Sequence, residues 1–146
     1  MNNNYDVIIV GTGAAGLFAG LGLPADLKVL MITKDKVENS DSYLAQGGIC
    51  TLKSADDFDA FYQDTLKAGR NENNPESVKI MIQQAPQIMK ELMDYGVEFD
   101  RDTEGNLAYT REGAHSEYRI LHHQDVTGKE ITSKLIKQVE MRNNIT

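Results

Sequence analysis

The segment from residue 110 to 122 is dense in side chains that can bind a small dianion and move protons. It reads Thr-Arg-Glu-Gly-Ala-His-Ser-Glu-Tyr-Arg-Ile-Leu-His. Arg111 and Arg119 offer planar guanidinium groups that suit carboxylates, and His115 and His122 are of the type that exchanges protons near neutral pH. The alternative is a charged loop packed by its apolar residues, because arginines most often lie at the surface. No metal site is expected, since no ligand spacing stands out.

A glycine-rich loop near the start of the chain has the spacing of a dinucleotide site. The pattern G-x-G-x-x-G follows a β-branched run and precedes a small-residue segment. We expect the first glycine to allow a tight turn, the second a close approach to a pyrophosphate, and the third close packing of helix and sheet. The pyrophosphate would bind at the helix N-terminus, although an ordinary strand–helix turn is the alternative. The predicted cofactor-binding residues of the loop are Gly11, Thr12, Gly13, Ala14, Ala15 and Gly16.

The residues about 20 positions further on leave the identity of the dinucleotide open. An acidic residue there commonly holds the adenosine ribose, and this stretch is Thr33-Lys34-Asp35-Lys36. Lys34 would favour a 2′-phosphate, as in an NADP site, or is simply a solvated lysine. The residues alone therefore allow both FAD and NADP.

A second cluster of small and polar residues spans residues 39–49. Its Gly47-Gly48 pair predicts backbone that passes close to another group or adopts a positive φ. Ser40 and Ser42 add hydroxyl groups that suit a polar ligand. An ordinary loop is the alternative.

Apolar runs at residues 6–10 and 28–33 are typical of strands buried on both faces, and residues 17–23 between them are long enough for a helix. This order predicts a right-handed βαβ unit with a parallel sheet, and hence an α/β fold. Residues 142–146 resemble the approach to a further strand. We therefore expect the chain to be cut short.

The middle of the chain is predicted to be mostly helical from its apolar spacing and its capping residues. A capping box at Ser54 opens one helix that ends at Gly69, and Asn74-Pro75 starts the next. Pro86 predicts a break near Ala85, with a second helix up to residue 96. The remaining predicted elements are strands at 97–99 and 107–109 around a turn at 102–105, and a helix opened by a capping box at Thr127 and Glu130.

Composition excludes several classes of function. The 146 residues carry a formal charge of −7, which is unsuited to an extended nucleic-acid surface, and they fit a single domain. No apolar run is long enough to cross a bilayer. Cys50 has no partner for an internal disulfide, and residues 1–5 lack the pattern of a secretory signal. A reducing cytoplasm is the expected location.

The second glycine cluster resembles a known superfamily. Lys34, Ser40-x-Ser42 and the Ala-Gln-Gly-Gly at 45–48 are similar to the flavoproteins of the succinate dehydrogenase, fumarate reductase and L-aspartate oxidase superfamily. The resemblance implies a Rossmann-like FAD-binding domain. It places along the FAD Lys34, Asp41, Ser42, Tyr43, Leu44, Ala45, Gln46, Gly47 and Gly48. Because Asp41 stands where respiratory members carry a histidine joined to the flavin, the implied FAD is non-covalent.

The segment that begins at Thr110 resembles the L-aspartate oxidase branch in particular, as does the Asp125-x-Thr127-Gly128 that follows it. In that branch the glutamate of the Arg-Glu-Gly segment faces the substrate, which makes Glu112 the expected catalytic residue. Its carboxylate would accept hydrogen bonds from the ammonium group of aspartate, a group that succinate and fumarate lack. The expected substrate-binding residues are Arg111, His115 and Arg119.

The resemblance implies FAD-dependent oxidation of L-aspartate to iminoaspartate, with oxygen or fumarate as electron acceptor. The product would pass to quinolinate synthase in NAD biosynthesis. Relatives use further groups from a capping domain and a C-terminal half, so residues 1–146 are expected to be the N-terminal part of the FAD-binding domain and to be inactive alone. The alternatives are a soluble fumarate reductase or succinate dehydrogenase flavoprotein, and a non-catalytic module that binds NADP or FAD.

Overall fold

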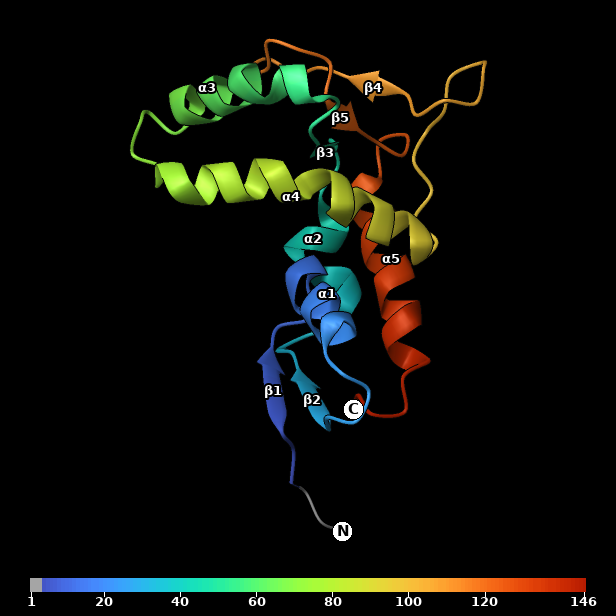
Figure 1. The fold of residues 1–146 in the computed structure, drawn as a ribbon. Helices are drawn as coiled ribbons and strands as arrows, with labels where there is room; N and C mark the ends of the chain where they lie inside the picture. Colours follow the sequence, from blue (N-terminus) through green and yellow to red (C-terminus); the bar gives the residue numbers. More distant parts are fainter. Residues whose placement is uncertain (1–3) are drawn as a thin grey trace. The chain divides into compact units, whose positions relative to one another are not determined.

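A computed structural model describes residues 4–146, and its contacts divide the chain into two compact units (Figure 1). The first unit comprises Met1–Gly47, of which residues 4–47 are described, together with Tyr95–Val97 and Val126–Thr146. The second comprises Gly48–Asp94 and Glu98–Asp125. No helix among the described residues is long and apolar enough to span a membrane.

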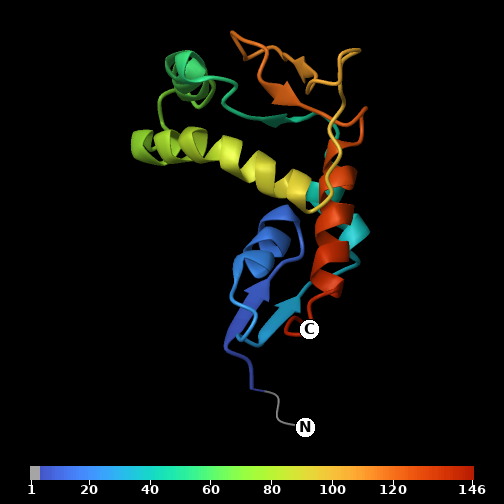
Figure 2. The ribbon, with the colours of Figure 1, turned by 45° about the vertical axis from the view of Figure 1, so that its right-hand side comes forward.

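The first unit is built on a strand–helix–strand motif. β1 (Val7–Val10) leads through a glycine turn into α1 (Ala14–Gly22), and the chain returns as β2 (Val29–Ile32). The two strands pair in parallel, with Val7 opposite Val29, and their arrows lie side by side in Figure 2. This confirms the predicted βαβ unit and the α/β class.

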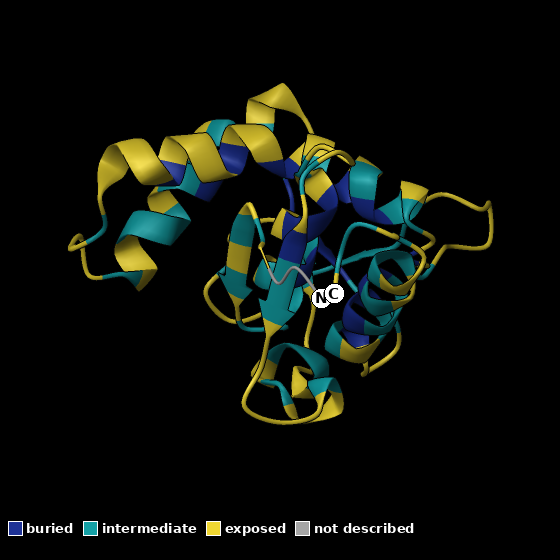
Figure 3. Cartoon of the chain, turned by 90° about the horizontal axis from the view of Figure 1, so that it is seen from below, coloured by how far each residue is buried: buried dark blue, intermediate teal, exposed yellow. Residues whose placement is uncertain are grey.

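One row of side chains on this pair of strands is exposed. Ile8 and Val10 retain 59 % and 80 % of their accessible surface, and Ile32 retains 44 %. No residue of β1 is buried, and Figure 3 colours the whole described chain by burial. The expectation of strands buried on both faces is wrong for this row, because α1 packs on the side of Ile9 and no described residue covers the other side to the same extent.

The end of the described chain pairs with the free edge of β2. Ile145 forms a parallel bridge with Val29, whose backbone N–H donates to Asn144 O at 2.8 Å and whose carbonyl accepts from Thr146 N at 2.9 Å. The Asn144 side chain also donates to Leu27 O at 2.7 Å. Residues 144–146 thus lie where a third parallel strand belongs, as the sequence predicts.

α5 (Thr127–Glu140) packs against α1 and against the short helix α2 (Asp41–Leu44), which follows the 3-10 turn η1 (Val37–Asn39). The buried residues of α5 share one face and are Thr127, Ile131, Thr132 and Leu135. The predicted helix is confirmed, but the predicted capping box is wrong. Val126 occupies the N-cap position and makes no side-chain cap, because the Thr127 hydroxyl is used elsewhere in the unit.

The second unit contains two packed helices, α3 (Phe58–Ala68) and α4 (Pro75–Asp94), preceded by the 3-10 turn η2 (Ala55–Asp57). Phe61, Val78 and Ile82 form the centre of its core. The helix starts at Asn74-Pro75 and the stop at Gly69 are confirmed, and Asn74 Oδ1 accepts from two backbone N–H groups of α4. Ser54 makes no side-chain cap, so the capping box expected there is wrong.

α4 is continuous through Pro86, which corrects the predicted break near Ala85. Its buried residues lie on one stripe at helical spacing, namely Val78, Ile82, Ala85, Met89 and Leu92. Pro86 lies outside this stripe and is exposed. Packing of the stripe on both sides of the proline outweighs the one hydrogen bond that proline removes.

Three two-residue strands complete the second unit: β3 (Ile49–Cys50), β4 (Tyr109–Thr110) and β5 (Ile120–Leu121). They form an antiparallel sheet in the order β3-β5-β4. The predicted turn at 102–105 is present, since Gly105 N donates to Asp102 O at 3.0 Å. The strand predicted at 97–99 is wrong; the turn is closed instead by a bridge between Arg101 and Leu107.

Candidate functional site

The glycine loop of the first unit has the geometry of a dinucleotide turn. Gly11 adopts φ 111°, a conformation that favours glycine, and its N–H donates to Ile32 O at 2.8 Å. A Cβ on Gly16 would collide with the Gly11 carbonyl oxygen and would lie 3.4 Å from Ile9 Cγ2. The turn and the close helix–strand packing expected of these glycines are therefore confirmed.

The N-terminus of α1 suits an anion. Gly13 occupies the N-cap position and has no side chain with which to cap the helix, while Ala14 N donates to Ser42 Oγ at 3.1 Å. The Thr12 hydroxyl is buried and has no hydrogen-bond partner. A positive helix end and a hydroxyl without a partner are features that suit a pyrophosphate.

A cavity of about 670 Å³ runs from this loop along the carboxyl ends of β1 and β2. Its lining includes Lys34, Asp35, Asn39, Asp41 and Ser42, so the structure brings the loop together with the predicted lysine and with the start of the second glycine cluster. This is the crevice at which doubly wound α/β sheets bind nucleotides. The residues present therefore fit the adenosine and pyrophosphate parts of a dinucleotide.

Asp35 is the acidic residue of the stretch that follows β2. Its carboxylate accepts from Lys36 N at 2.7 Å and from Asn39 Nδ2 at 3.0 Å, and these two hydrogen bonds lower its pKa. Lys34 lies beside it and is exposed. A carboxylate and a lysine side chain thus border the same cavity.

Residues 41–44 form helix α2, and the backbone becomes extended at Ala45. Ser40 caps α2, because its hydroxyl accepts from Tyr43 N at 3.2 Å. Asp41 lines the cavity, whereas Leu44 and Gln46 are exposed. Gly47 adopts φ 27°, which confirms the expected positive φ at one glycine of the pair.

Gly48 is needed for close packing within the second unit. A Cβ there would collide with Ile120 Cγ2 and lie 2.5 Å from Leu121 O. The Gly-Gly pair predicts backbone that passes close to another group. In the structure, the backbone of Gly48 passes close to β5. Each glycine of the pair meets one of the two expected requirements.

In the second unit, the predicted substrate segment carries Arg111 and Glu112 exposed at its surface. Arg111 Nη1 donates to Ser116 O at 3.3 Å, and the guanidinium lies 5.1 Å from the ring centroid of Tyr118. The carbonyl of Glu112 accepts from His115 N at 2.9 Å, which leaves the Glu112 carboxylate outside this turn. Arg111 and Glu112 can therefore meet a ligand from solvent.

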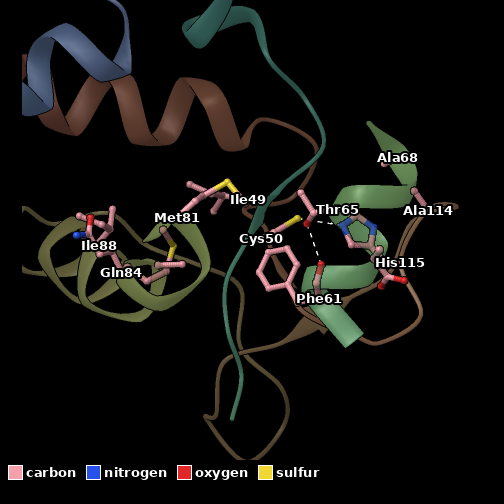
Figure 4. A pocket seen from close by; sticks show the side chains of 13 residues that line it. Ile49, Cys50, Phe61, Thr65, Ala68, Met81, Gln84, Ile88, Ala114 and His115 are labelled. Carbon is pink, nitrogen blue, oxygen red and sulfur yellow. Dashed lines mark hydrogen bonds between the residues drawn. The ribbon is translucent and has the colours of Figure 1, made fainter. Parts of the chain in front are cut away.

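His115 lines a second cavity, of about 620 Å³, between α3, α4 and β3 (Figure 4). Its Nε2 lies 3.1 Å from Cys50 Sγ, and its Nδ1 is buried without a partner. Burial raises the pKa of the Cys50 thiol, Arg119 opposes this shift, and the charge of Glu112 adds to it. Cys50 was not predicted as a partner of His115, because the two residues are 65 positions apart.

Arg119 is occupied within the second unit. Its side chain is fully buried, and its guanidinium donates to Asp57 and Asp64 and stacks over Phe61. This corrects the expectation that Arg119 offers a free fork to a substrate carboxylate, since two carboxylates of the chain already take that place. Asp57 gave no signal in the sequence beyond its position near the start of a helix, and Asp64, in the middle of α3, gave none.

His122, the other histidine of the segment, contacts Asp100, with Nδ1 3.1 Å from the carboxylate. Asp100 also accepts from Gln124 N at 2.9 Å. Among residues 4–146, no cluster of three or more His, Cys, Asp or Glu side chains is arranged to hold a metal ion.

The fold and the loop define a nucleotide-binding α/β protein, and comparison with known families specifies the nucleotide. The model of the FAD binding domain family matches residues 6–146, and the chain belongs to this family. FAD is accordingly its cofactor, which decides against the NADP site that Lys34 had left open.

The most similar curated proteins include L-aspartate oxidases. That of Clostridium acetobutylicum is 47 % identical over 145 residues, which cover 99 % of this chain and 33 % of the relative. That of Synechocystis sp. is 43 % identical over 98 % of this chain and 26 % of the relative. The chain thus spans about a third or less of the length of these relatives.

Similar solved structures include chains of a quinol fumarate reductase and of Sdh1. The Escherichia coli quinol fumarate reductase FrdA with the E245Q mutation superposes with a TM-score of 0.90 at 25 % identity, over 97 % of this chain and 25 % of that one. Mycobacterium smegmatis Sdh1 in complex with UQ1 gives 0.85 at 29 % identity, over 97 % and 26 %. The likeness supports the superfamily expected from the second glycine cluster.

Proposed function

We propose that this chain supplies the FAD-binding part and some of the substrate-binding groups of an enzyme that oxidises L-aspartate to iminoaspartate. The observation that carries the proposal is the 47 % identity to an L-aspartate oxidase across 99 % of the chain. It is supported by the glycine loop and by the exposed carboxylate of Glu112. Oxygen or fumarate would accept the electrons.

The first unit holds the cofactor in this proposal. The N–H groups at the start of α1 and the Thr12 hydroxyl bind the pyrophosphate, and Lys34 and Asp35 border the adenosine end. Residues 41–48 lie along the rest of the FAD. Bound FAD supplies the acceptor for the hydride that leaves Cα of aspartate.

The second unit contributes groups that recognise aspartate. The carboxylate of Glu112 accepts hydrogen bonds from the substrate ammonium group, and the Arg111 guanidinium donates to a substrate carboxylate. His115 is held by Cys50 and by its turn with Glu112, so its ring is positioned before substrate arrives. Arg119 is left out of this group because its guanidinium is buried and binds Asp57 and Asp64.

The proposed reaction also has a place among neighbouring reactions. Iminoaspartate would be consumed by quinolinate synthase in NAD biosynthesis, and the location would be the cytoplasm. The support for a reducing compartment is that Cys50, the one cysteine, is free.

Two experiments test the proposal. In the first, the purified chain is mixed with FAD and the cofactor retained after gel filtration is measured by absorbance; we expect a yellow complex, and no competition by NADP.

In the second, residues 1–146 replace the matching third of the Clostridium acetobutylicum enzyme, and the chimera is assayed with L-aspartate. A chimera that binds FAD and reduces fumarate but does not oxidise aspartate would favour a fumarate reductase and contradict the proposal.

A further inference from the structure

The first two residues of α5 hold the backbone that follows α2. Thr127 Oγ1 donates to the Gly47 carbonyl at 2.6 Å, and Gly128 N donates to the Ala45 carbonyl at 3.0 Å. Thr127 is 2 % exposed, so the donor side of this hydrogen bond is shielded from water, while Gly47 is exposed. Two carbonyls that lie two residues apart are therefore fixed to the same helix end.

The contact at Gly128 leaves no room for a side chain. A Cβ on this residue would collide with the Ser42 carbonyl oxygen and would lie 2.6 Å from Ala45 O. These are backbone atoms, which cannot move aside as the end of a flexible side chain can. The Thr-Gly sequence thus serves two purposes at one contact: the threonine provides a donor and the glycine provides space.

We propose that Thr127 and Gly128 are positioning residues that form a latch on residues 45–47 and thereby set the environment of the flavin ring. The inference rests on the proposed function, in which residues 41–48 lie along the FAD. Between the two anchored carbonyls lies Gln46, which is exposed and has room to meet a ligand. The latch gives a role to the Asp125-x-Thr127-Gly128 motif, which the sequence had indicated only as a family feature.

The physical consequence follows from how a protein tunes a flavin. Backbone and side-chain hydrogen bonds near the ring change its absorption, its affinity and its reduction potential. Removing the Thr127 hydroxyl leaves the Gly47 carbonyl without this donor and frees the segment to move. FAD would then be held more weakly and in an altered ring environment.

The test compares Thr127→Val with a threonine control from the same helix face. Thr132 is also fully buried, but its hydroxyl has no hydrogen-bond partner, so Thr132→Val removes a hydroxyl without breaking a contact. We expect Thr127→Val to weaken FAD binding by about 5- to 30-fold, the loss typical of one buried hydrogen bond, and to shift the visible absorption and the midpoint potential of bound FAD. Thr132→Val should change neither, and Thr127→Ser should restore both.

Each outcome decides between a positioning role and a structural role. Unchanged affinity and spectrum in Thr127→Val would overturn the proposal, as would weaker binding with an unchanged spectrum and potential. Uptake of no FAD by the unsubstituted chain would overturn it as well. If Thr127→Val does not fold, Thr127→Ala is measured in the same way. A shifted spectrum in a chain whose chimera does not oxidise aspartate would support the latch and contradict the proposed function alone.

Discussion

Arg119 binds Asp57 through two parallel hydrogen bonds, from Nε at 3.0 Å and from Nη2 at 2.6 Å. Its remaining terminal nitrogen donates to Asp64 at 2.6 Å, and the ring of Phe61 lies 4.9 Å away. The buried arginine thus ties the segment before β5 to η2 and α3. The hydrogen bonds to Asp57 and Asp64, and their negative charge, raise the pKa of Arg119 above its ordinary value against the effect of burial.

Arg119→Met should strongly destabilise the second unit. The change removes the charge that balances Asp57 and Asp64, whose side chains retain only 9 % and 19 % of their exposure. Breaking a buried pair in this way costs about 3–5 kcal/mol, measured as the loss in free energy of unfolding in urea. Lys90→Met is the control, because its pair with Asp94 is mostly exposed and should cost less than about 1 kcal/mol. Similar losses in both variants would contradict this view of Arg119.

Asp64 predicts a specific loss of stability in acid. Burial alone would raise its pKa, but hydrogen bonds from Ser116 and Arg119 lower it to about 2, below its ordinary value of 3.8. A carboxyl with a lowered pKa in the folded state stabilises the protein fully above about pH 4, and this contribution is lost as the pH falls towards 2. The loss should be roughly 2 kcal/mol in unfolding free energy. Asp64→Asn should flatten this part of the pH profile; an unchanged slope would assign it to other acids.

Elements governed by local signals could be predicted from the sequence. The first strand, the glycine turn and the second strand follow from β-branched runs on either side of Gly11 and Gly16, and Asn74 caps α4 as its type predicts. The helix break at Pro86 could not be judged locally. It depends on whether buried residues on both sides of the proline share one core, and Val78 and Leu92 do lie on one buried stripe.

In the candidate site, too, the features set by local sequence could be predicted, and those set by distant contacts could not. The geometry of the glycine loop and the place of Lys34 beside it could be predicted, because their spacing is short and its physical reason is known. The roles of Arg119 and Thr127 could not, because each depends on a partner far away in the sequence. Arg119 meets Asp57 across 62 positions, and Thr127 meets Gly47 across 80. Arg119 was predicted to bind substrate, but it binds Asp57 and Asp64 instead. Thr127 was predicted to cap α5, but its hydroxyl donates to Gly47 instead.

Pro86→Ala should stabilise α4. The proline is exposed in the interior of a 20-residue helix and has no N–H to donate, so alanine restores one hydrogen bond and removes a steric conflict. The gain should be about 1–3 kcal/mol in unfolding free energy. Gln83→Ala, at an exposed position of the same helix, should change stability by less than about 0.5 kcal/mol. A destabilising Pro86→Ala would show that the helix depends on the geometry imposed by proline.

FAD bound to this chain should be released by acid precipitation. Asp41 lines the cofactor cavity at the position where the superfamily resemblance implies a flavin-linked histidine in respiratory members, and a carboxylate does not provide the ring nitrogen for that bond. After precipitation, the absorbance near the flavin maximum should appear in the supernatant. Colour that stays with the pellet would indicate a covalent link made by another residue.

Glu112→Gln in the chimeric enzyme tests how aspartate is recognised. Glutamine keeps the shape and one carbonyl acceptor but removes the negative charge that we propose faces the substrate ammonium group. A charge-assisted hydrogen bond contributes about 1.5–3 kcal/mol, so aspartate oxidation should fall by roughly 10- to 150-fold in kcat/KM. Fumarate reduction should fall much less, because fumarate has no ammonium group and the change relieves repulsion of its carboxylates.

Glu117→Gln is the matched control, since Glu117 is an exposed carboxylate of the same segment and should leave both activities within about twofold. The ratio of the two activities is the decisive measurement, because a general loss of folding or FAD binding lowers both equally. Equal losses in Glu112→Gln would assign this residue to structure or to flavin positioning, and the preference for aspartate would have to come from another group.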